Sequence, residues 1–308
     1  MNQELKTAIL KTLCHFAVLE YPLTLLELQK FLTCRANFSE ILAVLSVLSV
    51  AGIIEQKDGF YFLPAPTDLV SQRLSRYSLA VKKFQRAQRI VMLLKYFPWV
   101  RALAVYSSLA FYNCRRASDI DLFVITSSGR LWSARFFINS FLKIFRLRPG
   151  EGGVADKIFV SYLVSEAGLN LVAAQAGWDD YFYNYFGPAS FTFLFGEEGV
   201  ISAFFQSNNW LQKIMPNWQP ITYNQMPPLK PNRQFFKNIF TKVVAIISEE
   251  KYQQLQLAIL PRRYRAIQNQ DQRVIISSQM IKLHDHDRAP ELNRLFTEKF
   301  HNFFHHAD

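Results

Sequence analysis

The feature that most constrains this chain is a pair of aspartates beside an apolar strand. Residues 99–126 hold a nearly all-apolar run, WVRALAVYS, then a polar segment, then DIDLFVIT. Both runs are short and bounded by polar residues, so we expect two strands covered on both faces. Asp119 and Asp121 stand two residues apart at the start of the second strand, which directs both carboxylates to one face. Two such carboxylates repel each other unless a cation joins them.

Magnesium suits this pair, because Mg²⁺ takes one or two carboxylates, keeps water ligands and completes its shell with substrate phosphates. Ser107 and Ser108 directly follow the first strand, where backbone N–H groups and hydroxyls can cradle a triphosphate. Arg115 and Arg116 lie in the loop before the aspartates and are available to phosphate charge. We therefore expect Asp119 and Asp121 to bind metal, and the two serines and two arginines to bind nucleotide phosphates.

The segments after the aspartates extend this pattern. LWSARFFINSFLKIF (131–145) has the spacing of an amphipathic helix, and DKIFVSYLV (156–164) that of a third buried strand. Strands separated by helical segments predict a small α/β unit.

The stretch ALAVYSSLAFYNCRRASDIDLFVI resembles the DNA-polymerase-β-like nucleotidyltransferase superfamily, in its minimal form. Members have an apolar strand, Gly-Ser, a connecting segment and Asp-x-Asp at the start of the next strand, and the spacing from Ser108 to Asp119 fits. The resemblance covers roughly residues 90–166. It implies Mg²⁺-dependent transfer of a nucleoside monophosphate from a nucleoside triphosphate (NTP) to an acceptor hydroxyl on RNA, a protein or a small molecule.

Two departures from the superfamily pattern stand out. Ser107 replaces the glycine that lets the backbone approach the triphosphate without an intervening Cβ. Active members usually carry a third carboxylate on a later strand, and KIFVSYLV has none. Asp156, just before that strand, is the first candidate for this catalytic role, and Glu166, just after it, is the second. If neither reaches the site, the resemblance implies nucleotide binding without transfer.

The N-terminal residues, 1–68, are predicted to form a winged helix-turn-helix-like domain. Apolar residues recur at helical spacing over 4–19, 25–32 and 38–51, with Asn37 or Ser39 as the cap of the third helix, and Asp58-Gly59 signals a hairpin. That third helix would read DNA, yet its only charged residue is Glu40. A protein-contact or spacer role is therefore at least as well supported as DNA binding.

The rest of the chain completes an α+β prediction. A basic connecting helix is expected over 69–97, with Leu74 on its apolar stripe, then a small mixed-sheet nucleotidyltransferase-like domain over 98–170. The final region, 171–308, is expected to be helical, with a long helix over 233–259. KLHDHDRA (282–289) is predicted to be a polar loop, because adjacent ligands rarely converge on one metal.

Charge supports a polyanionic partner. The formal net charge is +11, and ten basic residues but no acidic one lie between Asp68 and Asp119. Such a surround favours NTP and, through the basic surface, nucleic acid. A second hypothesis is a DNA- or partner-binding regulator with a degenerate transferase domain, and a third is a transferase that modifies a partner protein. Without a signal-peptide pattern or a long apolar span, we expect a cytoplasmic protein that does not contact the membrane.

Overall fold

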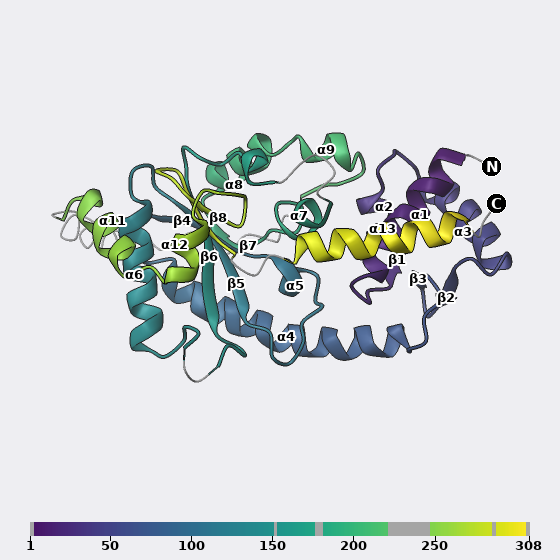
Figure 1. The fold of residues 1–308 in the computed structure, drawn as a ribbon, viewed down its shortest axis with the longest axis horizontal. Helices are drawn as coiled ribbons and strands as arrows, with labels where there is room; N and C mark the ends of the chain where they lie inside the picture. Colours follow the sequence, from purple (N-terminus) through teal and green to yellow (C-terminus); the bar gives the residue numbers. More distant parts are fainter. Residues whose placement is uncertain (1–2, 151–152, 176–180, 221–246, 285–287, 306–308) are drawn as a thin grey trace.

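The computed structural model describes residues 3–150, 153–175, 181–220, 247–284 and 288–305. They form a mixed α/β protein with two separate sheets. Figure 1 shows the larger sheet toward one end, and helices with the small sheet at the other. The long helix α4 (Leu69–Leu94) runs between the two ends. The C-terminal helix α13 (Ala289–His305) also reaches from the large sheet to the N-terminal helices.

The N-terminal part contains the three helices and the hairpin that the sequence pattern predicts, and a short additional strand, Leu23–Thr24, extends the hairpin to a three-stranded sheet. Its elements are α1 (Gln3–Ala17), β1 (Leu23–Thr24), α2 (Leu25–Phe31), α3 (Phe38–Val50), β2 (Glu55–Lys57) and β3 (Phe60–Phe62), with strand order β1-β3-β2. Thr24 and Asn37 start α2 and α3 through capping boxes, which satisfy backbone N–H groups that a helix start leaves unpaired. Asp58 and Gly59 both have positive φ and close the predicted hairpin.

The outward face of α3 carries several large apolar side chains and no basic one. Leu42, Val47 and Val50 are exposed to solvent, together with Phe38 at the start of the helix. A face without basic groups lacks the charge that binds a phosphate backbone.

Helix α4 buries one stripe against the large sheet. Ala80, Phe84, Ala87 and Val91 belong to the same hydrophobic cluster as the central strands. Leu74 was predicted to share this stripe, and that prediction was wrong. Its side chain is 52 % exposed, because the first half of the helix extends beyond the sheet.

The large sheet has six strands in the order β7-β4-β5-β6-β9-β8. The central three are β4 (Val100–Val105), β5 (Ile120–Thr126) and β6 (Ile158–Ser165), at the positions predicted for strands. β4 and β5 are antiparallel, whereas β5 and β6 are parallel, with the predicted helix α6 (Leu131–Ile144) between them in the chain. The short helix α5 (Ser107–Ala110) follows β4.

The prediction of a wholly helical region over 171–308 was wrong. Three strands of the large sheet come from it: β7 (Thr192–Gly196), β8 (Val274–Ile276) and β9 (Met280–Leu283). Each is too short for periodicity to separate it from a helix. β7 and β9 also pair with strands that are distant in sequence, β4 and β6, whereas β8 pairs with the neighbouring β9. Most of the helix predicted over 233–259 lies outside the described residues, and its end forms α11 (Glu249–Ala258). The other helices that the structure describes in this region are η1 (Val172–Ala174), α7 (Tyr181–Phe186), α8 (Glu198–Ser207), α9 (Leu211–Ile214), α12 (Arg262–Ile267) and α13.

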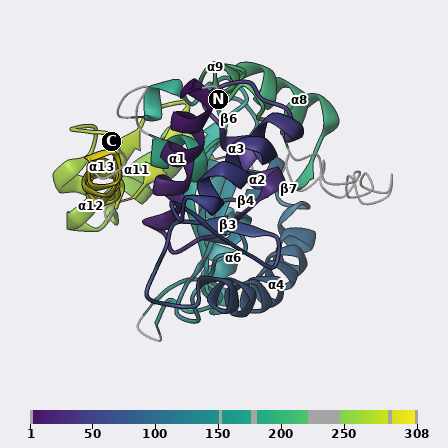
Figure 2. The same ribbon diagram turned by 90° about the vertical axis from the view of Figure 1, so that its right-hand side faces the viewer.

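The two faces of the large sheet are covered by different layers. Ile120, Leu122 and Val124 of β5 join a cluster with α4 and α6. Phe123 and Ile125, on the opposite face, join a cluster with Leu171 and with Phe204 of α8. Asp119 and Asp121 have the parity of Phe123, so they belong to the second face. Figure 2 shows the molecule end-on, with α4 and α13 on different sides.

Phe111 connects the two parts of the molecule. It lies in the loop after α5, yet its side chain belongs to the N-terminal hydrophobic cluster, where it contacts the rings of Phe16, Tyr21 and Phe31. The hydroxyl of Tyr21 donates to the Phe111 carbonyl over 2.9 Å. The loop that follows β4 is therefore anchored in the N-terminal part.

Within the described ranges, no helix combines the length and apolar character needed to cross a bilayer.

Candidate functional site

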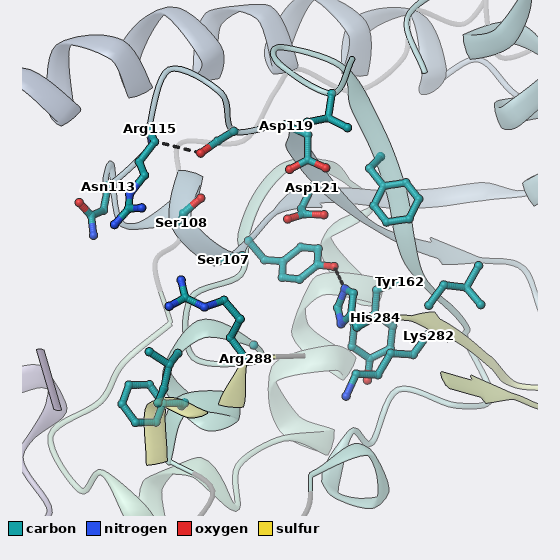
Figure 3. Close-up of a pocket in the computed structure, with 18 of the residues that line it drawn as sticks. Ser107, Ser108, Asn113, Arg115, Asp119, Asp121, Tyr162, Lys282, His284 and Arg288 are labelled. Carbon is teal, nitrogen blue, oxygen red and sulfur yellow. Dashed lines mark hydrogen bonds between the residues drawn. The ribbon is translucent and has the colours of Figure 1, made fainter. Parts of the chain in front are cut away.

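A cavity of about 730 Å³ opens where β4 ends and β5 begins. The antiparallel pairing of these strands brings Ser107 and Ser108 to the same sheet edge as Asp119 and Asp121, and all four line the cavity. Figure 3 shows the two carboxylates pointing into it, with Arg115 on one side and Arg288 on another. The lining also includes residues from the end of α1, from α4 and from the C-terminal segments.

Asp119 and Asp121 form a partly buried pair. Burial raises the pKa of both carboxyl groups, and the charge of Asp119 raises that of Asp121 further. These directions show that the surroundings of the pair disfavour two negative charges. A cation placed between the carboxylates would reverse this effect.

Ser161 is the side chain of β6 that touches this pair. The register between β5 and β6 shifts after Leu122–Val160, so that Phe123 pairs with Tyr162 and Ser161 is left as the extra residue. Irregularities of this kind redirect a side chain. The Ser161 hydroxyl donates to Oδ1 of Asp121 over 3.2 Å, which lowers the pKa of that carboxyl against the larger effect of burial.

A chain of buried hydroxyls extends from Ser161 to the C-terminal region. The Tyr106 hydroxyl bonds to Ser161 and also lies 2.7 Å from Nε2 of His284. Burial lowers the pKa of His284 to about 3 and raises that of Tyr106, so both groups are neutral near pH 7. Three neutral side chains from three segments thus fix the orientation of one carboxylate.

Ser107 adopts the backbone conformation expected of a glycine. Its φ is +59°, in the left-handed region that L-residues with a Cβ rarely occupy. Ser107 begins α5, and Ser108 follows it in the helical turn, where its carbonyl accepts from the Asn113 N–H over 2.9 Å. The turn after β4 therefore has a backbone conformation that favours glycine, but the residue there is a serine, which carries a Cβ.

The two arginines before the aspartates have different positions. Arg115 lines the cavity, and its side chain is 69 % exposed. Arg116 is exposed and is not a lining residue, although its carbonyl accepts from the Lys83 ammonium over 3.3 Å. The structure therefore brings Arg115, but not Arg116, to the serines and aspartates.

Neither candidate for the third carboxylate lines the cavity. Asp156 has a positive φ and forms an ion pair of 2.6 Å with Lys83, whose Nζ also donates to the Ser118 carbonyl over 2.7 Å. Glu166 follows the opposite end of β6, where it lies 3.6 Å from Arg101. The side chain of β6 that hydrogen-bonds to Asp121 is that of Ser161.

Several residues that line the cavity were not predicted from the sequence. They are Arg76 of α4, Tyr106, Asn113 and, from the C-terminal region, Arg263, Lys282, His284 and Arg288. Ser161, which bonds to Asp121 but does not line the cavity, was also missed. A serine within the apolar run FVSYLV was a usable signal for Ser161. KLHDHDRA was predicted to be a polar loop, but its first two residues end β9, and His284, the next, is held by Tyr106. Asp285, His286 and Asp287 lie outside the described residues.

Comparisons with known proteins returned no match for this chain, whether against protein-family models, curated proteins or solved structures.

Proposed function

We propose that the cavity binds an NTP with Mg²⁺ and transfers its nucleoside monophosphate to an acceptor hydroxyl. The observation that carries this proposal is the pair Asp119 and Asp121, which enters a large cavity. Among the lining residues that the structure describes, the other charged ones are all basic: Arg76, Arg115, Arg263, Lys282 and Arg288. Carboxylates attract metal, and arginines bind phosphate oxygens through paired N–H groups. Both requirements of a metal–triphosphate substrate therefore meet in one cavity.

The fold also supports the proposal. The antiparallel β4–β5 pair, the parallel β5–β6 pair and the serine turn after β4 fit the nucleotidyltransferase-like arrangement implied by the sequence. The three N-terminal helices and their small sheet fit a winged-helix arrangement.

The donor groups suit a hard divalent cation. Two carboxylates supply oxygen ligands, and their raised pKa values show how much a positive charge would stabilise their ionised forms. The described residues contain no cluster of three or more His, Cys, Asp or Glu side chains arranged to hold a metal. Substrate phosphates and water would supply the remaining ligands, as is usual for Mg²⁺. When bound, the metal would neutralise phosphate charge and promote ionisation of the acceptor hydroxyl.

The protein's own side chains have distinct tasks in this proposal. Ser107 and Ser108 offer backbone N–H groups and hydroxyls to the triphosphate, and Arg115 offers a guanidinium that is free to reorient because it is largely exposed. Ser161, supported by Tyr106, orients Asp121. Orientation of this kind matters because small displacements of a reacting group reduce rates strongly.

Calorimetric titration of each Mg²⁺–NTP tests the proposal. We expect binding to the wild-type protein and to Asp58→Asn, a control in the β2–β3 turn, where asparagine tolerates positive φ. Binding should weaken by about 10-fold or more in Asp119→Asn and Asp121→Asn, since losing one ligand charge removes at least about 1.4 kcal/mol. Labelled NTP with RNA then tests transfer. Equal binding by all four proteins, or binding by none, contradicts the proposal.

A second candidate function is a regulator that binds the nucleotide without transferring it. Ser161 occupies the place on the third strand that touches Asp121, and the nearest acidic candidate, Asp156, is paired with Lys83. In this case Asp119→Asn abolishes nucleotide binding, no labelled product forms with any acceptor, and binding to DNA or to a partner protein is unchanged. Any DNA binding would weaken steeply with salt.

A further inference from the structure

Glu20 places an acidic side chain against two cavity arginines. Its Oε2 lies 2.6 Å from Nη2 of Arg76 and 3.8 Å from Nη2 of Arg115. Arg76 comes from α4 and Arg115 from the loop before β5, and both line the cavity beside Asp119 and Asp121. Glu20 itself is not a lining residue; it follows α1, at the edge of the N-terminal part.

The Arg76 side chain is largely buried and is held by several hydrogen bonds. It is 11 % exposed, although arginine is rarely buried without partners. Nη1 donates to Oδ1 of Asn113 over 3.1 Å and to the Leu19 carbonyl over 3.4 Å, while Nη2 reaches Glu20. The guanidinium is therefore held in one orientation by neutral oxygens, and its remaining face meets an anion.

Glu20 lies in a tight turn beside the two arginines. Glu20 has φ +53°, and its N–H donates to the Ala17 carbonyl over 3.1 Å in the turn that ends α1. A left-handed conformation is unfavourable for glutamate, so the surrounding turn must hold it. The carboxylate, in contrast, is 45 % exposed and can leave the arginines without unpacking the core. The hydrogen bond from Arg76 lowers the pKa of Glu20, so the group is ionised at neutral pH.

We propose that Arg115 and Arg76, the latter oriented by the Asn113 side-chain oxygen, form a phosphoryl-binding subsite that the Glu20 carboxylate occupies in this structure and that a substrate phosphoryl group takes over. This inference rests on the proposed function, since it assigns part of the same cavity to the substrate. Carboxylate and phosphate present similar oxygen pairs to a guanidinium, so one can replace the other on the same donors. The dianionic terminal phosphoryl group outcompetes a monoanionic carboxylate for two arginines.

Glu20 therefore acts as an internal competitor of the substrate. A bound phosphoryl group displaces it, and the displaced side chain belongs to the turn that connects α1 to β1. The affinity of the cavity for phosphate thus depends on the N-terminal part, although that part supplies none of the proposed metal ligands.

Glu20→Gln tests the competition because it keeps the shape of the side chain and removes its charge. Inorganic tripolyphosphate without metal and each Mg²⁺–NTP are titrated into the full-length protein by calorimetry. We expect affinity for both probes to rise about 2- to 5-fold, which corresponds to the upper part of the range for a partly exposed charge pair. Glu4→Gln, which removes the same charge at the other end of α1, should change neither affinity.

A double-mutant cycle with Arg115→Gln isolates the shared arginine. Arg115 is largely exposed, so its replacement leaves folding intact. Arg115→Gln alone should weaken tripolyphosphate binding, and the gain from Glu20→Gln should shrink in its presence, because coupled residues are not additive. Unchanged or weaker binding of tripolyphosphate by Glu20→Gln overturns this inference.

The two probes separate this inference from the proposed function. If Glu20→Gln binds tripolyphosphate more tightly but no NTP binds to either protein, the phosphoryl subsite stands and the nucleotide function fails. If Mg²⁺–NTP binds equally to both proteins and requires Asp121, the proposed function stands and the competition by Glu20 fails.

Discussion

Ser161 and Asp121 face each other across two parallel strands, joined by a hydrogen bond of 3.2 Å from the serine hydroxyl to Oδ1. A neutral donor stabilises an ionised carboxylate, but it supplies no charge to offset Asp119. The pKa of Asp121 therefore stays above its ordinary value, because burial and the neighbouring carboxylate outweigh one hydrogen bond.

The raised pKa of Asp121 predicts a stability that falls with pH when metal is absent. A carboxyl with a pKa above its unfolded value, about 4, stabilises the fold fully below that value. The stabilisation is lost as the pH rises through the raised pKa. In EDTA, the melting temperature of the wild-type protein should therefore fall between pH 5 and pH 8 relative to that of Asp121→Asn. Thermal unfolding at a series of pH values measures this difference, and a constant difference across the range would show that Asp121 ionises normally.

Ser107→Gly and Ser108→Gly should change stability in opposite directions. Ser107 has φ +59°, so glycine removes strain of about 1–2 kcal/mol, which exceeds the cost of about 0.5–1 kcal/mol for the added freedom of the unfolded chain. Ser108 lies in a helical turn, where glycine costs about 0.5–1 kcal/mol. Urea denaturation of the two variants gives the comparison. Equal destabilisation by both would mean that position 107 is not strained.

Lys83 is predicted to be a structural anchor of the aspartate loop. Its buried ammonium donates to the carbonyls of Arg116 and Ser118 and pairs with Asp156. Lys83→Met leaves these acceptors unsatisfied and should lower the free energy of unfolding by about 1–3 kcal/mol. Lys82→Met, at an exposed position of the same helix, should change it by less than about 0.5 kcal/mol. Chemical denaturation of both variants distinguishes them, and similar values would contradict an anchoring role.

Many helices and strands, and the core of the candidate site, could be predicted from local patterns in the sequence. The serine pair and Asp119 and Asp121 could be placed at one sheet edge because strand parity and the order of strand, turn and strand are local properties. The three N-terminal helices and their hairpin carry capping and turn residues that act over a few positions. The strands β4, β5 and β6 were predictable for the same reason.

The contributions that were missed depend on tertiary geometry. Ser161 reaches Asp121 only because the register shifts by one residue, and His284 reaches Tyr106 only because β9 pairs with β6. Thr192–Gly196 lies in an aromatic run without a clear period, so its strand becomes visible only from its pairing with β4. Glu20 pairs with Arg76 from a left-handed backbone conformation, which the pattern of side chains in the sequence does not reveal.

The position of Phe111 has a consequence for how the molecule comes apart. Its ring completes the hydrophobic cluster of the N-terminal part while its backbone belongs to the loop that carries the serine turn. Separating the two parts would leave a void in the N-terminal core, where the Phe111 ring packs. It would also remove the anchor of the loop that follows β4. We therefore expect the two parts to unfold together, so that loss of structure in the N-terminal helices is also loss of the cavity.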